Sequence, residues 1–230
     1  MFNNIQGNLT LVNEYICYQL ATILDIPMPP SGVCLCDENT IDFQGDLRDE
    51  NKGYGFYSTY IEKNTILKMG IMKHVSNIDI FYKVVIFDHF VYNKDRNLAN
   101  LLVEYKKNNI FISVIDHSHV FKNETIWDKN CFEIGIKEND YLDKYIMQRN
   151  NAIYQMFYQN INVDYNRLME FAKEVQHKIT DEILEQIIFN IPQEWKVSES
   201  NLRALMEYLK YRREHLPEMC QVIVDYIHSN

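Results

Sequence analysis

The chain of 230 residues is 47% hydrophobic and 24% charged, which is typical of a globular protein and excludes a disordered chain or a fibre. Its net charge of -9 lacks the basic field that favours nucleic acid, so no direct nucleic-acid binding is expected. The sequence shows neither a secretory signal nor an apolar run of the roughly 20 residues that span a bilayer. These features predict a cytoplasmic protein that makes no membrane contact.

The first part of the chain is predicted to combine one helix with short strands. Apolar residues recur at three- and four-residue steps over residues 9–24, as on the buried face of a helix. Pro27 ends this pattern because proline cannot continue a helix. A strand, a polar loop and a stretch that is either strand or loop are expected to follow: Gly32–Leu35, Asp37–Lys52 and Gly53–Tyr60.

The cysteines of the chain are scattered, and their odd number, 5, argues against a disulfide framework. Cys34 and Cys36 form a C-x-C pair within the first predicted strand. Strand alternation explains this pair better than a metal site does, because no second pair of Cys or His residues lies at zinc spacing.

The middle of the chain is predicted to run from a buried helix through a polar loop into a β-hairpin. Residues Ile78–Tyr92 are densely apolar, and their number favours a helix over a strand. A polar break follows at Asn93–Asn100. Two short β-rich runs, Leu101–Val103 and Ile110–Ile115, then flank a segment with the composition of a hairpin loop.

The part of the chain from Asn139 onward is predicted to be almost entirely helical. Amphipathic or capped helices are expected at 164–179, 183–189, 202–213 and 217–227, with Thr180 and Ser198 as N-caps of the second and third. The order of elements predicts an α+β fold, in which a smaller portion (residues 1–75) joins an α-rich portion (residues 76–230).

Three polar residues around the predicted hairpin carry the chemistry. Asp95 and Asn100 lie five residues apart in the loop before the first strand, and Asp116 follows the second strand. The hairpin therefore brings Asp116 close to Asn100. In phosphoryl transfer, one carboxylate takes the proton of the acceptor hydroxyl, while an amide oxygen and a second carboxylate hold magnesium on the nucleotide phosphates. The spacing of these residues fits those parts.

Several short runs resemble the HipA-like kinases, and in particular their short Ser/Thr kinase group. The central match consists of N-K-D-R-N (93–97), N-L-L (100–102) and I-D-H (115–117). Two further segments agree with the same family: L-V-N-E with I-P-M-P-P (11–14 and 26–30), and I-P-Q-E-W (191–195). The resemblance spans roughly residues 5–196.

This resemblance implies an ATP- and Mg²⁺-dependent protein Ser/Thr kinase of toxin or regulatory type on a bilobal fold. Residues 1–75 would form an abbreviated N-lobe, and residues 76–230 the catalytic C-lobe. Asp95 would be the catalytic base, assisted by Asn100, and Asn100 with Asp116 would bind the metal and the nucleotide. Glu14 would be the acid of the N-lobe helix that pairs with the ATP-binding lysine.

The sequence departs from the family pattern before Glu14. Kinases of this kind place a phosphate-binding loop and the ATP-binding lysine on strands ahead of the helix, but here residues 1–13 contain no lysine. The first lysines in the chain come after the helix: Lys52, Lys63, Lys68 and Lys73. Either these strands are missing from this chain, or another chain supplies them, or the nucleotide is held differently.

Two other functions therefore stay open at this point. One is a pseudokinase or split-kinase binding module, which would work with a small partner chain that supplies the strands or with an antitoxin-like regulator. The other is a phosphotransferase acting on a lipid or small molecule, because a fold does not determine its substrate.

Overall fold

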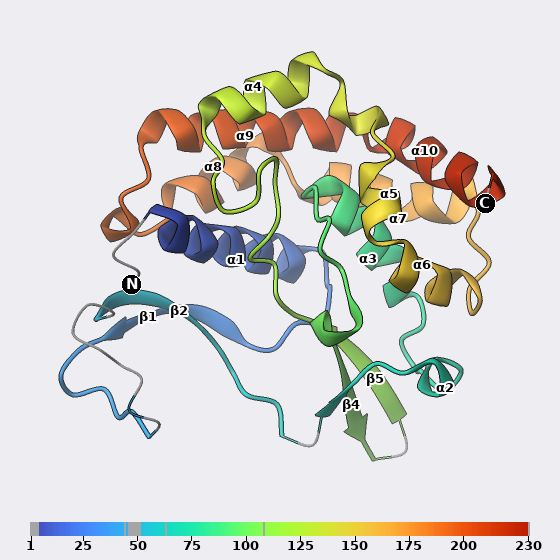
Figure 1. Ribbon diagram of the computed structural model, residues 1–230, viewed down its shortest axis with the longest axis horizontal. Coiled ribbons are helices and arrows are strands. Elements are labelled where there is room, and N and C mark those ends of the chain that lie inside the picture. The colour runs from blue at the N-terminus through green and yellow to red at the C-terminus, as the bar shows by residue number, and fades with distance from the viewer. Residues whose placement is uncertain (1–4, 44, 46–51, 63, 108, 230) are drawn as a thin grey trace.

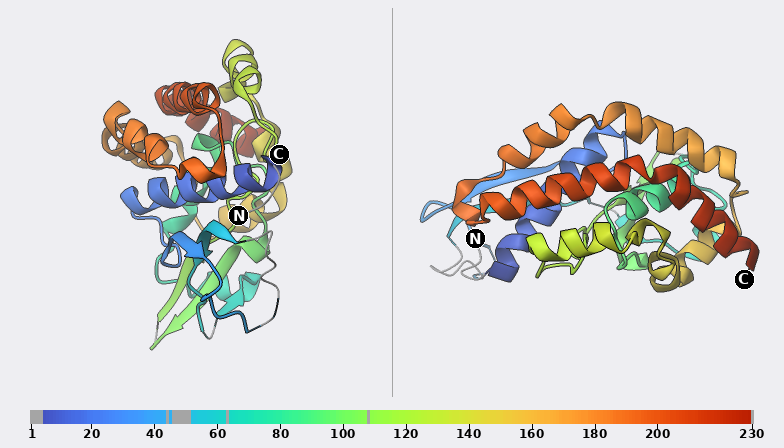
Figure 2. Two further views of the ribbon diagram at one scale, coloured as in Figure 1. Left: turned by 90° about the vertical axis from the view of Figure 1, so that its left-hand side faces the viewer. Right: turned by 90° about the horizontal axis from the view of Figure 1, so that it is seen from above.

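The computed structural model describes residues 5–43, 45, 52–62, 64–107 and 109–229. Its strands lie on one side of the molecule and most of its helices on the other, with helix α1 (Ile5–Ile23) between the two layers (Figures 1 and 2). The α+β class predicted from the sequence is therefore confirmed.

Helix α1 matches the predicted helix and is buried on the expected face. Val12, Ile16 and Leu20 are completely inaccessible to solvent, so the three- and four-residue spacing does mark the side that packs on the core. The helix ends at Ile23, two residues before Asp25, whose positive φ of 52° reverses the chain ahead of Pro27.

The two strands after α1 form a small antiparallel sheet. Strand β1 (Ser31–Cys36) pairs with β2 (Gly53–Ser58), with Ser31 opposite Ser58. The stretch 53–60 is thus a strand over most of its length. The Sγ atoms of Cys34 and Cys36 lie 3.9 Å apart as free thiols, as strand alternation predicts. Within the loop predicted at 37–52, residues 44 and 46–51 lie outside the described part of the chain.

The predicted hairpin is present and gains a third strand. β4 (Leu101–Lys106) pairs with β5 (Asn109–Val114) in antiparallel register, and β3 (Asn64–Ile66) joins the open edge of β4. The sequence did not predict β3, because three residues are too few to show an alternating pattern. The short helix α2 (Met69–Met72) was missed for the same reason.

Helix α3 (Ile80–Phe90) is the central helix of the larger layer. Nine of its residues are buried, including Asp88 and His89, and it contacts α7, α9 and α10. A helix that is apolar on all sides is expected to lie inside a protein, so the dense pattern at 78–92 correctly indicated a buried helix.

Most of the remaining helices lie in the larger layer, while the short segments η2 and η4 contact strands β3 and β2 (Figure 1). The remaining helices are η2 (Leu98–Asn100), α4 (Lys129–Lys137), η3 (Asp140–Leu142), α5 (Tyr145–Arg149), α6 (Asn151–Tyr158), α7 (Tyr165–Lys178), α8 (Asp181–Phe189), η4 (Gln193–Trp195), α9 (Glu199–Glu214) and α10 (Leu216–Ser229). The predicted caps are confirmed, since Thr180 accepts the amide of Ile183 and Ser198 that of Asn201. Helix α4 was not predicted.

The two layers share one hydrophobic core. Helix α1 packs on β1 and β2 on one side and on α8 and η4 on the other. The division into two portions at about residue 75 stays a prediction. No helix in the part of the chain that the structure describes is both long and apolar enough to cross a membrane.

Candidate functional site

The loop that carries Asp95 is held rigidly through its backbone while its carboxylate stays exposed. The amide of Asp95 donates to Asn93 Oδ1 at 3.0 Å. The carbonyl of Asp95 accepts from the side-chain amides of Asn97 and Asn100, at 3.1 and 3.0 Å. Because every one of these contacts uses the main chain, the carboxylate of Asp95 faces solvent in a fixed position, where a substrate could reach it.

The hairpin register brings Asn100 and Asp116 together, as the sequence predicted. Leu101 pairs with Val114, and the amide of Ile115 donates to the carbonyl of Asn100 at 3.0 Å. Asp116 is the next residue. The side-chain amide of Asn100 donates to the Asp95 carbonyl, which ties the loop to the start of the hairpin. Loop and hairpin therefore bring the backbone positions of Asn100 and Asp116 close together.

The carboxylate of Asp116 is oriented by the residue two positions later. Ser118 donates its hydroxyl to Asp116 Oδ1 at 2.6 Å, and the same hydroxyl contacts His119 Nδ1 at 2.8 Å. Asp116 itself adopts a left-handed conformation with φ of 58°, which is uncommon outside glycine and is frequent at functional sites. Within the described residues Oδ2 of Asp116 makes no hydrogen bond, so this oxygen can serve a metal.

Arg96 connects the two loops from inside the protein. Its guanidinium is fully buried and binds Asp88 in two places, with Nη2 2.8 Å from Oδ1 and Nε 3.2 Å from Oδ2. It also donates to the carbonyl of Ile115 at 3.2 Å and to His117 Nε2 at 2.9 Å. Burial and the Arg96 charge hold the pKa of His117 well below its usual range, so this imidazole is neutral and accepts through Nε2.

Glu14 reaches the same place from α1. Its Oε1 accepts the backbone amide of His117 at 3.0 Å, and the carboxylates of Glu14 and Asp116 are near enough to repel. Burial, with a smaller contribution from Asp116, raises the pKa of Glu14 to about 7. Among the described residues Glu14 makes no ion pair, so the predicted pairing with a lysine is not seen there.

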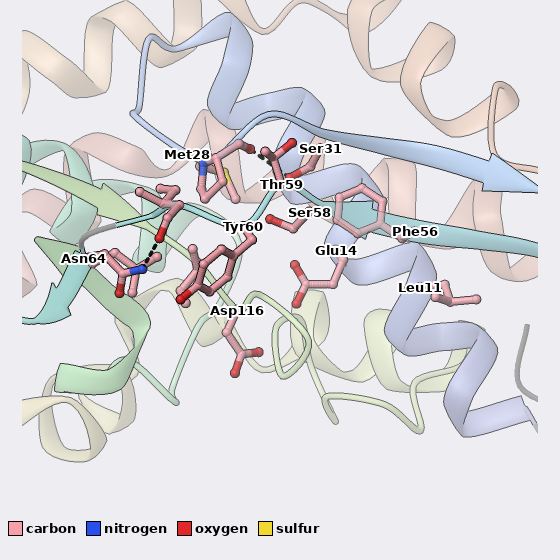
Figure 3. A pocket seen from close by; sticks show the side chains of 14 residues that line it. Leu11, Glu14, Met28, Ser31, Phe56, Ser58, Thr59, Tyr60, Asn64 and Asp116 are labelled. Atoms are coloured by element: carbon pink, nitrogen blue, oxygen red, sulfur yellow. Dashed lines mark hydrogen bonds between the residues drawn. The ribbon is translucent and has the colours of Figure 1, made fainter. Parts of the chain in front are cut away.

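A pocket of about 570 Å³ lies between α1, the strands and Asp116 (Figure 3). Its walls are mostly apolar, with Leu11, Met28 and Phe56 among them; the carboxyl group of Glu14 extends into it, and Asp116 lies at its rim. A mostly apolar cavity of this size with a few convergent polar groups is typical of sites for nucleotide-sized ligands.

The residues around the pocket suit magnesium and a nucleotide in part. An amide oxygen and a carboxylate oxygen are the ligands that Mg²⁺ prefers, and it takes its others from water and phosphate. Lys52, Lys68 and Lys73 are among the first lysines after the helix, and none of them lines the pocket. Lys63 lies outside the described residues. The described lining thus supplies carboxylates that could bind a metal, those of Glu14 and Asp116, but no lysine or arginine for the phosphates.

Sequence reasoning missed the groups that hold this site in shape. The one signal was Asp88, an acid inside an otherwise apolar helix, which indicates a buried partner. Asn150 showed no signal at all, yet it accepts the amide of Arg96 at 3.0 Å and donates to the carbonyl of Asn93 at 2.8 Å. Contacts of this kind join residues more than 50 positions apart, so no local pattern reveals them.

Comparisons with known proteins indicate the family and the fold of the chain. The sequence profile described as HipA-like kinase matches residues 4–221. A search of curated proteins found no match. Among solved structures, the chain is similar to the crystal structure of a Helicobacter pylori proinflammatory kinase, CtkA, with a TM-score of 0.58 and 12% sequence identity. That similarity covers 94% of this chain and 81% of the other, and at this identity it shows a shared fold.

Proposed function

This chain belongs to the HipA-like kinase family, and on that basis we propose that it is an ATP- and Mg²⁺-dependent protein Ser/Thr kinase of toxin or regulatory type. The observation that carries the proposal is the hairpin pairing that brings Asn100 next to Ile115, and so near Asp116, which lines the pocket, with the exposed Asp95 on the adjoining loop. A metal site and a base in this order are what phosphoryl transfer requires.

Each residue has a separate task in this proposal. Asn100 Oδ1 and Asp116 Oδ2 hold Mg²⁺, which supplies positive charge to the phosphates of the nucleotide when bound. Asp95 orients the acceptor hydroxyl and takes its proton, because its carboxylate is exposed while its backbone is fixed. Arg96 keeps both loops in register by binding the carbonyl of Ile115 and the carboxylate of Asp88.

The pocket supports a nucleotide as the second substrate. The apolar side chains of Met28 and Phe56 offer surface for a planar base, and the acidic end near Glu14 and Asp116 is where the metal would lie. A charged ligand without a metal would be repelled by these two carboxylates. We therefore expect nucleotide binding to depend strongly on the divalent cation.

Phosphate transfer from radiolabelled ATP to the chain itself and to a generic protein substrate tests the proposal. Wild-type protein should transfer phosphate with Mg²⁺ and not with EDTA, and Asp95→Asn should lose the transfer while keeping nucleotide binding. Asp225→Asn is the matched control, since Asp225 is an exposed residue on α10 whose partner is Gln221. Absence of transfer from the wild type under every metal and substrate condition, with ATP bound, would contradict catalysis.

A split-kinase or pseudokinase module is the second candidate, and a specific observation favours it. The described residues lining the pocket include no lysine or arginine, whereas phosphate groups usually bind such a cation. In this reading a small partner chain adds strands and the missing charge, or an antitoxin-like regulator binds the site.

A thermal-shift titration separates the two candidates. A ligand at 100 times its dissociation constant should stabilise the chain by roughly 2.7 kcal/mol. A shift with Mg²⁺ and ATP, together with phosphate transfer, supports the complete kinase. A shift without transfer supports the pseudokinase, and transfer that appears only when a second chain is added supports the split enzyme.

A further inference from the structure

We propose that Asn13 is a positioning residue. Its buried side-chain amide attaches residues 117–127, here called the post-Asp116 segment, to helix α1. This attachment holds Asp116 at the pocket. What this position serves rests on the proposed kinase function. The attachment itself is a property of the chain and can be measured without any activity. Asn13 lies in the L-V-N-E segment (11–14), but the sequence motif by itself gave this residue no role.

The side chain of Asn13 makes three hydrogen bonds to the post-Asp116 segment. Its Nδ2 donates to the carbonyl of Ser118 at 2.7 Å and to the carbonyl of Glu124 at 3.0 Å, and its Oδ1 accepts from Nε1 of Trp127 at 2.9 Å. Asn13 is completely buried and Trp127 almost so. Both donors and the acceptor of this amide are therefore used within one segment more than 100 residues away in the sequence.

The segment needs such an attachment because its backbone is unfavourable. Asp116, Phe121, Asn123 and Glu124 all have positive φ values, between 58° and 68°. Residues other than glycine adopt this conformation at a cost and keep it only where surrounding contacts fix it. Asn13 donates to the carbonyl of Glu124, which is one of these residues, and to that of Ser118, which lies two positions after Asp116. The hydrogen bonds of Asn13 thus lie close to the residues with the unfavourable backbone conformation.

Glu14 adds a fourth contact from the same turn of α1. It accepts the amide of His117, the residue directly after Asp116. In the protein kinases an acid on this helix pairs with a lysine, but the described residues around Glu14 provide none. Consecutive side chains of α1 therefore bind the segment itself. Because a helix moves as a unit, α1 and Asp116 are expected to move together.

Asn13→Asp is the sharpest test, because it exchanges one atom group for an isosteric one. The carboxylate can still accept from Trp127, but the two donations are lost, and an oxygen replaces the nitrogen 2.7 and 3.0 Å from two carbonyl oxygens. Hydrogen exchange measured by mass spectrometry on the ligand-free chain should show the amides of 117–127 exchanging at least tenfold faster. The protection of α3 should stay unchanged.

Leu20→Ala provides the matched control. Leu20 is a fully buried apolar residue of the same helix, seven positions after Asn13. It should lower the melting temperature at least as much as Asn13→Asp, yet change the exchange of 117–127 less than twofold. If both variants accelerate the segment equally, its protection reports only general stability, and the proposal is wrong.

A second readout tests whether the attachment positions Asp116. Mn²⁺ binding, followed by electron paramagnetic resonance, should weaken about tenfold in Asn13→Asp and not in Leu20→Ala. Faster exchange with unchanged Mn²⁺ affinity would show that Asn13 orders the segment without positioning the metal ligand, which contradicts the proposal. If the wild type binds no Mn²⁺ at all, the proposed function fails, while the exchange experiment still tests the attachment.

Trp127→Phe keeps the test decisive if Asn13→Asp does not fold. It removes only the indole donor and leaves both donations of Asn13 in place, so the segment should exchange about threefold faster. An unchanged exchange rate in Trp127→Phe, in a folded protein, would contradict the role of the three-bond cluster.

Discussion

The buried carboxylates of the helical layer form ion pairs, whereas those at and near the pocket form none with the part of the chain that the structure describes. In the helical layer, Asp88 and Asp140 are buried, and each lies 2.8 Å from the guanidinium of a buried arginine, Arg96 and Arg212 respectively. At and near the pocket, Glu14, Asp95 and Asp116 form no ion pair with the described residues. The chain therefore neutralises its structural acids with buried arginines and leaves the acids of the site without a cationic side chain.

This difference identifies which acids are free for a ligand. A buried charge without a partner is costly, so an unpaired carboxylate persists only where water, a proton or an external cation can reach it. Glu14 takes a proton near neutral pH, since its pKa is raised to about 7 by burial. Asp95 and Asp116 are exposed instead. Of the acids in this chain, these two are therefore the best placed to act on a substrate and a metal.

The largest expected effect is on phosphate transfer. Replacing Asp95 by Asn removes the proton acceptor and should lower the turnover number about 10²- to 10⁴-fold, the usual worth of a general base. Asp116→Asn should instead raise the Mg²⁺ concentration needed for half-maximal rate. A rate assay at several Mg²⁺ concentrations distinguishes the two, and equal effects of both variants on metal dependence would argue against their separate tasks.

The next effect is on stability, and it comes from the paired acids. Arg212→Met removes the buried guanidinium from Asp140, leaving Tyr208 and the more distant Lys122, and should cost about 3–5 kcal/mol of unfolding free energy. Arg212 also donates to the carbonyl of His89, which adds to the loss. Urea denaturation measures the change.

Arg203→Met is the matched control for that variant. Arg203 forms an exposed ion pair with Glu199 one turn earlier in α9, and such pairs contribute about 0.3–0.5 kcal/mol. If Arg203→Met destabilised the chain as much as Arg212→Met, the contrast between buried and exposed pairs would not hold.

The pH dependence of stability should have opposite signs in the two regions. The folded pKa of Glu14 lies above its ordinary value of 4.5, so its contribution to stability is full below about pH 4.5 and is lost as the pH rises toward 7. The folded pKa of His89 is lowered by burial from 6.5 to about 4, so its contribution is present above pH 6.5 and is lost as the pH falls toward 4.

Variants of these two residues reveal the signs. Relative to wild type, Glu14→Gln should become more stable as the pH rises from 5 to 7, by at most about 1.4 kcal/mol per pH unit. His89→Asn should become relatively more stable as the pH falls over the same range. Chemical denaturation at pH 5, 6 and 7 provides the comparison, and parallel curves for a variant and the wild type would exclude titration of that residue.

Apart from the control Arg203→Met, the smallest expected effect lies at an exposed helix end of the helical layer. Thr180 caps α8 by accepting the amide of Ile183 at 3.3 Å. Thr180→Ala should cost about 1 kcal/mol, the typical worth of such a cap, with phosphate transfer unchanged. A loss above 2 kcal/mol would mean that Thr180 has further contacts in the folded chain.

Local pattern was sufficient wherever one element could be recognised from its own residues. The spacing in α1, the density of apolar residues in α3 and the caps of α8 and α9 all indicated elements that the structure contains. The juxtaposition of Asn100 and Asp116 was also predictable, because a hairpin of known register brings its ends together. Short elements such as β3 gave no such signal.

The sequence alone determined the family, the order of the longer elements and the residues proposed for the metal and base positions, since each depends on local spacing. Only the tertiary structure decided which acids are paired and which are open, where the pocket lies, and that Asn13 and Glu14 bind the post-Asp116 segment. The physical reason is that most of these contacts join residues 72 to 105 positions apart, and that the energy of all of them depends on burial, which the sequence does not display.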